Sequence, residues 1–218
     1  MLIKGMYQKM YPFIKYLEDN FIKTRYVFLT KMQDLKKFSE DNPFVNVIKI
    51  DINKKNIGQK YLEILKKYIP EEKLVNRFNC PFLLLYLAIS KETSQLAGYY
   101  WVIVPDKKPV WHDKYCVRPG EAFGFDAFVV PEYRGKGIFP FLKAEAVKDC
   151  TLDRKCKGLY SVVERSNKSS IKANLKLGSI VGKNYLVKIF RRNVMSIYIG
   201  ERNCRVYYVF RNFKGRSF

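Results

Sequence analysis

Two glycines stand where a β-prone run gives way to helical spacing, in the segment VVPEYRGKGIFPFL from Val129 to Leu142. Free N–H groups at the start of a helix, together with the positive end of the helix dipole, bind phosphate groups. Gly135 and Gly137 allow the main chain to approach an anion closely. Arg134 and Lys136 add positive charge beside them. The segment therefore predicts an anion-binding loop, although it contains neither a Walker-type P-loop nor the dinucleotide-binding pattern.

Two carboxylates accompany the apolar run AFGFDAFVV, which is expected to be a strand buried on both faces. Alternation along a strand places Glu121 on the same face as Phe123 and Phe125 and points Asp126 to the opposite face. Either carboxylate is a candidate general base. The alternative is a solvated carboxylate near a strand end, and a buried Asp126 would need a partner or a raised pKa.

The loop expected between residues 105 and 120 carries Trp111 and the single histidine of the chain, His112. Both side chains are candidates for contacting a substrate. His112 is also a candidate for proton transfer, because the unperturbed pKa of histidine lies near neutrality. The alternative is an exposed histidine without a role in chemistry.

A second polar segment, NKSSIKANLKLG from Asn167 to Gly178, also has helical spacing. Asn167, Ser170 and Asn174 are three and four residues apart, so they share one face of the expected helix. That face is a candidate for contacting a ligand. Alternatively, Asn167 caps the helix and Gly178 ends it.

Hydrophobic periodicity and turn residues predict helices and strands along the rest of the chain. Apolar residues at three- and four-residue steps after Asn56 indicate an amphipathic helix that ends before Pro70. Two β-prone runs separated by the polar residues 91–95 suit a hairpin. Strands are expected at 25–32, 44–52, 82–90, 96–104, 122–130, 158–164, 180–191 and 195–210. Helices are expected at 56–69, 71–77, 138–150 and 169–177.

The 218 residues suit one globular domain, and 48% hydrophobic residues with 16% aromatics are sufficient to build its core. We expect residues 1–23 to form a helical extension and residues 24–218 to form the domain. The longest apolar stretch, Pro81 to Ile89, is much shorter than the roughly 20 residues of a membrane-spanning helix. The first residues lack the apolar centre of a secretory signal, so a cytoplasmic protein is expected.

The composition is strongly basic, with a formal net charge of +21. Such a charge attracts polyanions, so nucleic acid, an anionic membrane surface and an acidic carrier protein are candidate partners. The alternative is a lysine-rich surface without a specific partner, because the basic residues are scattered. The five cysteines form no C-x-x-C pair and are expected to be reduced thiols, and no metal site is predicted.

Together these segments resemble the motifs of the GNAT superfamily of acyl-CoA-dependent N-acetyltransferases. PEYRGKGI is similar to the pyrophosphate loop of that family, [RQ]-x-x-G-x-[GA], in which Arg134 and Gly137 match and Phe139 replaces the last small residue. NKSSIKANLKLG resembles the later family motif, in which an asparagine after the fifth strand precedes a helix that ends in K-x-G. The order of the expected strands and helices is also similar to that of the family.

The resemblance implies an α/β (α+β) fold with a twisted, mixed and mostly antiparallel central sheet of six to seven strands flanked by helices. Two splayed strands of this sheet would form the acyl-CoA cleft. The resemblance also implies acetyl-CoA or another acyl-CoA as co-substrate, without a metal ion. Both a monomer and a homodimer are compatible with it.

The resemblance further assigns roles to residues by their places in the motifs. Glu121, thirteen residues before Arg134, has the place of the glutamate base of some members, with Asp126 as the second candidate. Many members carry a tyrosine acid where this chain has Asn174, so the candidate acid is Tyr185 on the next strand, unless water alone assists the thiolate. Acyl-CoA binding is assigned to Phe128, Val129, Val130, Arg134, Gly135, Lys136, Gly137, Ile138, Phe139, Asn167, Ser170 and Asn174. Acceptor binding is assigned to Trp111, His112, Phe123 and Phe125.

The favoured function is transfer of an acetyl group from acetyl-CoA to a primary amine by direct attack, with a small amine or an amino sugar as acceptor. Two alternative enzymes are a protein or peptide N-acyltransferase and an acyltransferase that depends on an acyl carrier protein. An alternative of another class is a module that binds acyl-CoA or nucleic acid without turnover. The departures from the family pattern at Phe139 and Asn174, and the high charge, favour that last alternative.

Overall fold

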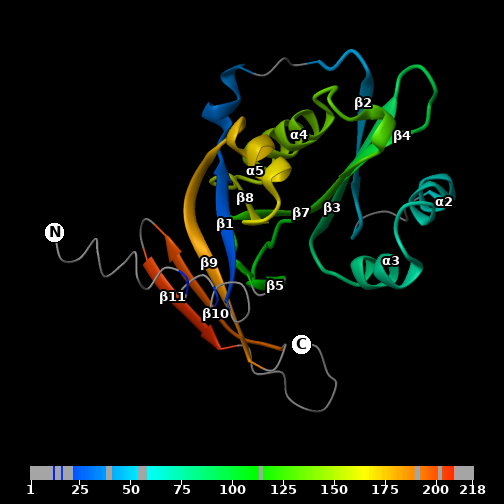
Figure 1. Cartoon of the computed structure of the whole chain (residues 1–218). Helices are drawn as coiled ribbons and strands as arrows, with labels where there is room; N and C mark the ends of the chain where they lie inside the picture. The colour runs from blue at the N-terminus through cyan, green and yellow to red at the C-terminus, as the bar shows by residue number, and fades with distance from the viewer. Residues whose placement is uncertain are drawn as a thin grey trace. The chain divides into compact units, whose positions relative to one another are not determined.

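The structure, a computed structural model, describes residues 12, 16, 22–37, 41–53, 58–112, 115–189, 192–200 and 203–208. The chain divides into two compact units, whose elements are labelled in Figure 1. The larger unit comprises residues 29–161 and 172–179, and the smaller unit comprises residues 1–28, 162–171 and 180–218. Most of the expected N-terminal extension lies outside the described residues, so the boundaries 1–23 and 24–218 stay predictions.

A mixed, mostly antiparallel sheet forms the centre of the larger unit. Its strands are β2 (Val45–Asp51), β3 (Leu83–Ser90), β4 (Leu96–Ile103), β7 (Ala122–Val129) and β8 (Leu159–Glu164), the last of which continues into the smaller unit. The order is β8-β7-β4-β3-β2, and β8 is parallel to β7 whereas the other neighbours are antiparallel. The predicted strands and the predicted hairpin over 91–95 are confirmed, with each strand end within one residue of its predicted position.

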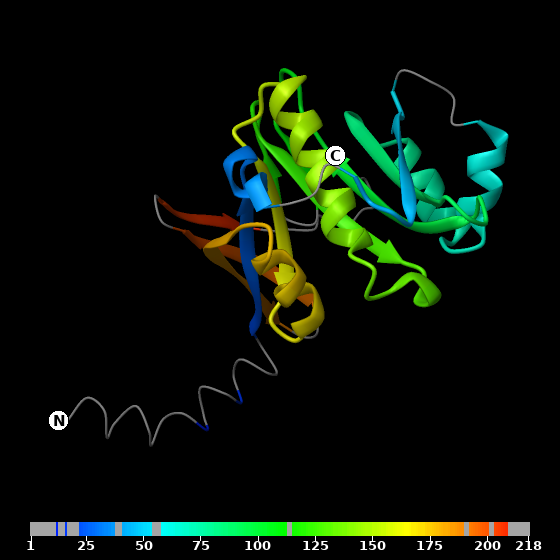
Figure 2. The same ribbon diagram turned by 90° about the horizontal axis from the view of Figure 1, so that it is seen from above.

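Helices cover both faces of this sheet, as Figure 2 shows: α4 (Ile138–Leu152) lies on one face, and α2 (Gln59–Lys66) and α3 (Glu71–Phe78) lie on the other. Side chains of β3 alternate between the two faces because successive residues of a strand point in opposite directions. Leu84, Tyr86 and Ala88 are buried in the core on the α4 side, and Leu83, Leu85 and Leu87 are buried in the core on the α2 and α3 side. The predicted α/β class is thereby confirmed. In the described part of the chain, no helix combines the length and the apolar character that crossing a bilayer requires.

The smaller unit contains most of β1 (Ile22–Thr30) and β9 (Ser179–Ile189), together with β10 (Arg192–Gly200), β11 (Asn203–Tyr208) and the first part of α5 (Lys168–Leu175). The strand order is β11-β10-β9-β1. The sequence pattern predicted one strand over 195–210, which is wrong: Gly200 pairs with Asn203, so β10 and β11 form a hairpin. Glycine and asparagine favour turns, and they interrupt the apolar run at this point.

Two short elements of the larger unit are absent from the predictions. The expected loop from 105 to 120 contains a small hairpin of β5 (Val110–His112) and β6 (Tyr115–Val117), and a 3-10 helix, η1 (Met32–Lys37), follows β1. Three-residue strands are too short to show a period of two. Helix α2 ends at Lys66 rather than at residue 69, with a turn before Pro70.

Candidate functional site

The predicted glycine loop lies between β7 and α4. After Val130, a single 3-10 turn, η2 (Pro131–Tyr133), leads to Arg134 and then to Gly137, which is the N-cap of α4. Gly135 and Gly137 have φ angles of +83° and +72°, in the left-handed region that glycine occupies without strain. A Cβ atom at either glycine would have nothing within 4 Å, so the loop presents an open main-chain surface. The predicted strand, glycine loop and helix are confirmed.

The backbone donors of this loop are largely unused. In the part of the chain that the structure describes, no group accepts a hydrogen bond from the N–H groups of residues 135 to 139. The Arg134 N–H does not belong to this run, because it donates to the Pro131 carbonyl at 3.1 Å. The remaining donors are consecutive and lie at the start of a fifteen-residue helix, where an anion is favoured.

Side chains hold the loop from its outer side and add positive charge. Lys136 Nζ lies 5.2 Å from the ring centroid of Phe44 and 5.1 Å from that of Tyr133, which is the geometry of cation–π contacts. The Asn42 side-chain amide donates to the Lys136 carbonyl at 3.4 Å, and Arg134 Nε donates to the Val129 carbonyl at 3.2 Å. Arg134 and Lys136 remain exposed, so both cations are available to a bound anion.

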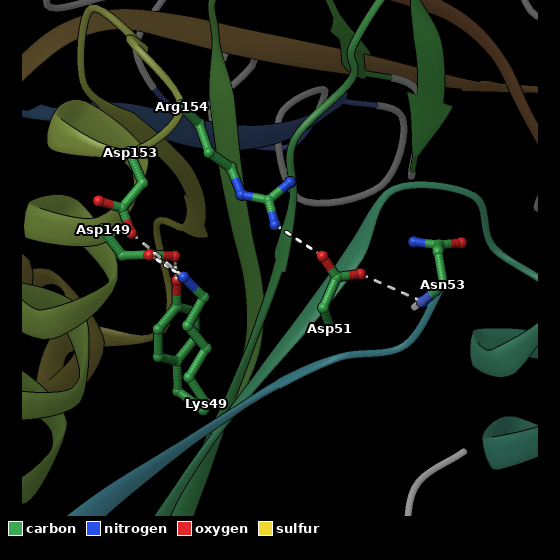
Figure 3. Close-up of polar contacts among 7 residues, drawn as sticks. Lys49, Asp51, Asn53, Asp149, Asp153 and Arg154 are labelled. Carbon is green, nitrogen blue, oxygen red and sulfur yellow. Dashed lines mark hydrogen bonds and ion pairs between the residues drawn. The ribbon is translucent and has the colours of Figure 1, made fainter. Parts of the chain in front are cut away.

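The far end of α4 is fixed to the sheet by a polar cluster, shown in Figure 3. Lys49 of β2 forms ion pairs with Asp149 and Asp153, and Arg154 pairs with Asp51 at 2.7 Å. Burial alone would raise the pKa of the Asp149 carboxyl, but hydrogen bonds from Lys49 and from Tyr86 prevail and lower it. This carboxylate therefore stays charged, and the cluster holds α4 in place at the end opposite the glycine loop.

β7 changes its pairing on both sides near its middle. On the β4 side, Phe125 pairs with Trp101 and Phe128 pairs with Tyr99, so two residues of β7 oppose the single residue Tyr100. This is a β-bulge, and its first residue, Asp126, has a φ angle of +45°. On the β8 side, pairing covers only residues 122 to 124, opposite residues 159 to 161. The second half of β7 is therefore paired with β4 alone, as expected for splayed strands.

The bulge also determines which way the acidic side chain points. Asp126 forms an ion pair with Arg77 of α3, and Phe125 packs in the core on the same face of the sheet. The predicted alternation, which placed Asp126 on the opposite face, is wrong here because a bulge inserts an extra residue. The Arg77 guanidinium lies 5.0 Å from the Trp101 ring centroid, and burial lowers the pKa of Arg77.

Aromatic rings gather on the face of the sheet that carries this ion pair. Phe128 stacks on Tyr99 with ring centroids 5.5 Å apart, and the half-exposed Tyr68 lies 5.7 Å from Phe128. Of the predicted acceptor residues, His112 and Phe125 come together, with ring centroids 3.9 Å apart. Phe123 is only 3% exposed and lies beneath them, so it supports this surface rather than forming it. The Trp111 side chain lies outside the described residues.

The other predicted catalytic and acyl-CoA residues are placed as follows. Glu121 lies just before β7, and its Oε2 accepts a hydrogen bond from the Arg118 N–H at 3.0 Å. The Tyr185 side chain lies outside the described residues. Phe128 and Val129 are half-buried on β7, but the Val130 N–H donates to the Ala97 carbonyl at 2.9 Å and is not a free donor. Ile138 is buried and Phe139 packs against the core of the larger unit.

The asparagines of the second motif have two different environments. Asn167 is exposed, and its Oδ1 accepts hydrogen bonds from the Ser170 N–H and the Ser169 hydroxyl, which confirms the alternative of a cap for α5. Asn174 is 1% exposed. Its Oδ1 accepts hydrogen bonds from Lys143 Nζ at 2.5 Å and from the Ser161 hydroxyl at 3.0 Å. Its side chain is thus bonded within the protein.

Lys143 is the residue that the sequence patterns missed. It is completely buried on α4, and burial lowers the pKa of its amine to about 7. One signal was present in the sequence: position 143 lies four residues after Phe139 and four before Val147, which are both apolar. Helical spacing thus marks a core position, and a lysine there is unusual because buried ammonium groups are costly.

Comparisons with known proteins bear on the fold. No family model matches the chain, and no curated protein is similar to it in sequence. A solved structure of a functionally unknown conserved protein from Staphylococcus epidermidis ATCC 12228 matches 78% of this chain at a TM-score of 0.53 and 14% identity. A tandem GNAT protein from the clavulanic acid biosynthesis pathway, solved without acetyl-CoA, matches 72% of this chain at a TM-score of 0.52 and 14% sequence identity. The chain spans 63% and 49% of the lengths of these two proteins.

Proposed function

We propose that this chain, which has the fold of the GNAT superfamily, is an acyl-CoA-dependent N-acyltransferase that acetylates a primary amine. The observation that carries the proposal is the run of unused N–H donors from residue 135 to residue 139 at the start of α4. Oriented donors at a helix start suit an anion with several oxygens, and the diphosphate of coenzyme A is such an anion. Arg134 and Lys136 supply countercharge at the rim of the loop.

The main chain of β7 supports the placement of the thioester. The bulge at Asp126 and Ala127 leaves backbone groups outside the regular β4 ladder, and the β8 ladder ends before it. These groups are the candidates for binding the carbonyl oxygen on which negative charge develops during attack. Phe128 and Val129, which follow the bulge, are the candidates for contacting the pantetheine arm between the thioester and the diphosphate.

The reaction is direct attack of a neutral amine on the thioester carbonyl. The N–C bond forms, the C–S bond breaks, and the electron pair of that bond passes to sulfur. The amine must lose a proton, and Glu121 is the candidate base because one of its carboxylate oxygens has no hydrogen-bond donor among the described residues. Asp126 is paired with the Arg77 guanidinium, so it is better suited to binding an ammonium group than to removing a proton.

The acceptor is proposed to be a small amine or an amino sugar bound against the aromatic surface near the bulge. The ring pairs His112–Phe125 and Phe128–Tyr99 offer ring faces on the side of the sheet to which Asp126 points. Ring faces suit the apolar face of a sugar and also attract cations. A carboxylate next to such faces would orient the amino group of the acceptor.

The first experiment is calorimetry with coenzyme A and acetyl-CoA. Micromolar or tighter binding that weakens with added salt supports the loop assignment, because phosphate contacts are screened by salt. Thiol release from acetyl-CoA across a panel of primary amines and amino sugars then tests turnover. Binding without thiol release would favour a non-catalytic module, and the absence of coenzyme A binding would overturn the proposal.

A further inference from the structure

A lysine, a serine and an asparagine form a buried polar cluster in the larger unit. Lys143 Nζ on α4 donates to Asn174 Oδ1 on α5 at 2.5 Å and to Ser161 Oγ on β8 at 3.2 Å. The Ser161 hydroxyl also donates to Asn174 Oδ1, at 3.0 Å. Lys143 is 0%, Asn174 1% and Ser161 6% exposed, so this cluster is shielded from solvent.

The cluster lacks a negative charge to balance the lysine. Its partners from β8 and α5 are a hydroxyl and an amide, and desolvation is the cause of the shift in the pKa of Lys143. An ammonium group has three N–H donors, and acceptors among the described residues account for two of them. The third donor of this buried amine has no acceptor among the described residues.

The place of the cluster in the fold indicates an acceptor for this donor. Ser161 is the last residue of β8 that pairs with β7, opposite Gly124, so the amine lies where the β7–β8 ladder ends. Two residues further along β7 is the bulge at Asp126, where the thioester is proposed to bind. In the second motif, residues 167–178, Asn174 stands where many members of the GNAT superfamily carry the tyrosine acid. The amine of Lys143 thus occupies the neighbourhood in which a leaving thiolate needs a proton.

We propose that the ammonium group of Lys143 is the proton donor to the sulfur of the departing coenzyme A, in place of the tyrosine. This inference rests on the proposed function. In the step, the C–S bond of the tetrahedral intermediate breaks, its electron pair stays on sulfur, and one proton moves from Lys143 Nζ to that sulfur. The neutral amine then regains a proton from water, so the proton lost by the acceptor nitrogen and the proton gained by sulfur balance.

The electrostatics of the site are consistent with this transfer. Burial lowers the pKa of Lys143 to about 7, below the value of roughly 8.5 for an ordinary thiol. Proton transfer from this ammonium to a thiolate is therefore downhill.

The test measures the thiol of bound coenzyme A and needs no acceptor. The full chain is saturated with coenzyme A, the ultraviolet absorbance of the thiolate is followed against pH, and the complex with desulfo-coenzyme A gives the baseline. If Lys143 contacts the sulfur, the thiol pKa in the wild-type complex should be lower than in the Lys143→Met complex, because an N–H of the amine, charged or neutral, donates a hydrogen bond to the thiolate. Lys148→Met is the matched control, because Lys148 is on the same helix and pairs with Glu145 near the surface. It should leave the thiol pKa unchanged.

Each outcome decides the proposal. Equal thiol pKa values in wild type and Lys143→Met, with coenzyme A still bound, overturn the role of Lys143 and leave the acyltransferase proposal standing. If the wild-type protein does not bind coenzyme A, both the role of Lys143 and the acyltransferase proposal are overturned. If Lys143→Met does not fold, Lys143→Gln replaces it, because glutamine can still bond to Asn174.

Discussion

Arg77 of α3 and Asp126 at the bulge of β7 form an ion pair on the face of the sheet that carries the aromatic cluster. Arg77 is mostly buried, whereas the Asp126 side chain is 40% exposed, so the pair presents its carboxylate to solvent. The left-handed backbone at Asp126 directs this side chain out of the regular strand alternation. A carboxylate held in this way is available to a cationic ligand.

Asp126→Asn should weaken binding of a cationic acceptor while leaving binding of coenzyme A intact. Asparagine tolerates the left-handed conformation, so the bulge should survive the change. A hydrogen bond to a charged group contributes about 1.5–3 kcal/mol, so KM for the amine should rise by about tenfold or more, with a smaller change in kcat. Steady-state kinetics with acetyl-CoA and the best amine of the panel measures both. An unchanged KM would remove Asp126 from the acceptor site.

Glu121→Gln should show the opposite kinetic pattern. If Glu121 accepts the proton of the attacking amine, its removal should lower kcat by about a hundredfold and leave KM nearly unchanged, the magnitude expected for a general base. Glutamine still accepts the hydrogen bond from the Arg118 N–H through its side-chain oxygen, so the turn before β7 should persist. A kcat within about twofold of wild type would show that water, and not Glu121, takes the proton.

Local sequence patterns predicted the parts of the site that are formed by a short stretch of consecutive residues. Two glycines between a β-prone run and a helical run are enough to predict an anion-binding loop, and the structure places Gly135 and Gly137 in the conformation that only glycine adopts easily. The five strands of the main sheet of the larger unit were predicted well because they are apolar and bounded by turn residues. The β10–β11 hairpin was missed because residues 195–210 were read as one continuous β-prone run.

The contacts that give the site its charge pattern could not be predicted from local patterns. Arg77 and Asp126 are 49 residues apart, and Lys143 and Asn174 are 31 apart, so both pairs depend on how distant elements pack. The bulge in β7 leaves no clear signal in AFGFDAFVV, although it decides the direction of Asp126. Position 143 has the helical spacing of a core residue, but lysine is rarely buried, so local patterns did not single it out.

Gly137→Glu should abolish coenzyme A binding by placing a carboxylate against the diphosphate. A side chain at a φ of +72° also strains the backbone by about 1–2 kcal/mol, so strain must be separated from charge. Gly120→Glu is the matched control: Gly120 has a φ of +80°, a Cβ there meets nothing within 4 Å, and it lies in the turn before β7. Calorimetry should show at least about a hundredfold loss of affinity in Gly137→Glu alone, because like charges repel strongly at contact distance.

Equal losses of affinity in the two glycine variants would trace the effect to backbone strain and contradict the loop assignment. Gly137→Ala adds a second comparison, since it has the strain without the charge. Its affinity should fall only several-fold, because its methyl group enters open space. An affinity of Gly137→Glu equal to that of wild type would mean that the diphosphate binds elsewhere.

The buried lysine makes a prediction about stability that is independent of any ligand. The pKa of Lys143 falls from 10.5 to about 7 on folding, so between these values the unfolded chain holds a proton that the folded chain has lost. The free energy of unfolding therefore rises with pH across this window, by up to about 1.4 kcal/mol per pH unit. Relative to Lys143→Met, wild type should gain about 2 kcal/mol between pH 7 and pH 9, measured by urea denaturation at each pH. Lys148→Met, in which the buried amine is intact, should follow the pH dependence of wild type. A constant difference between wild type and Lys143→Met would show that the amine keeps its proton throughout, as it would if solvent reached it in the folded protein.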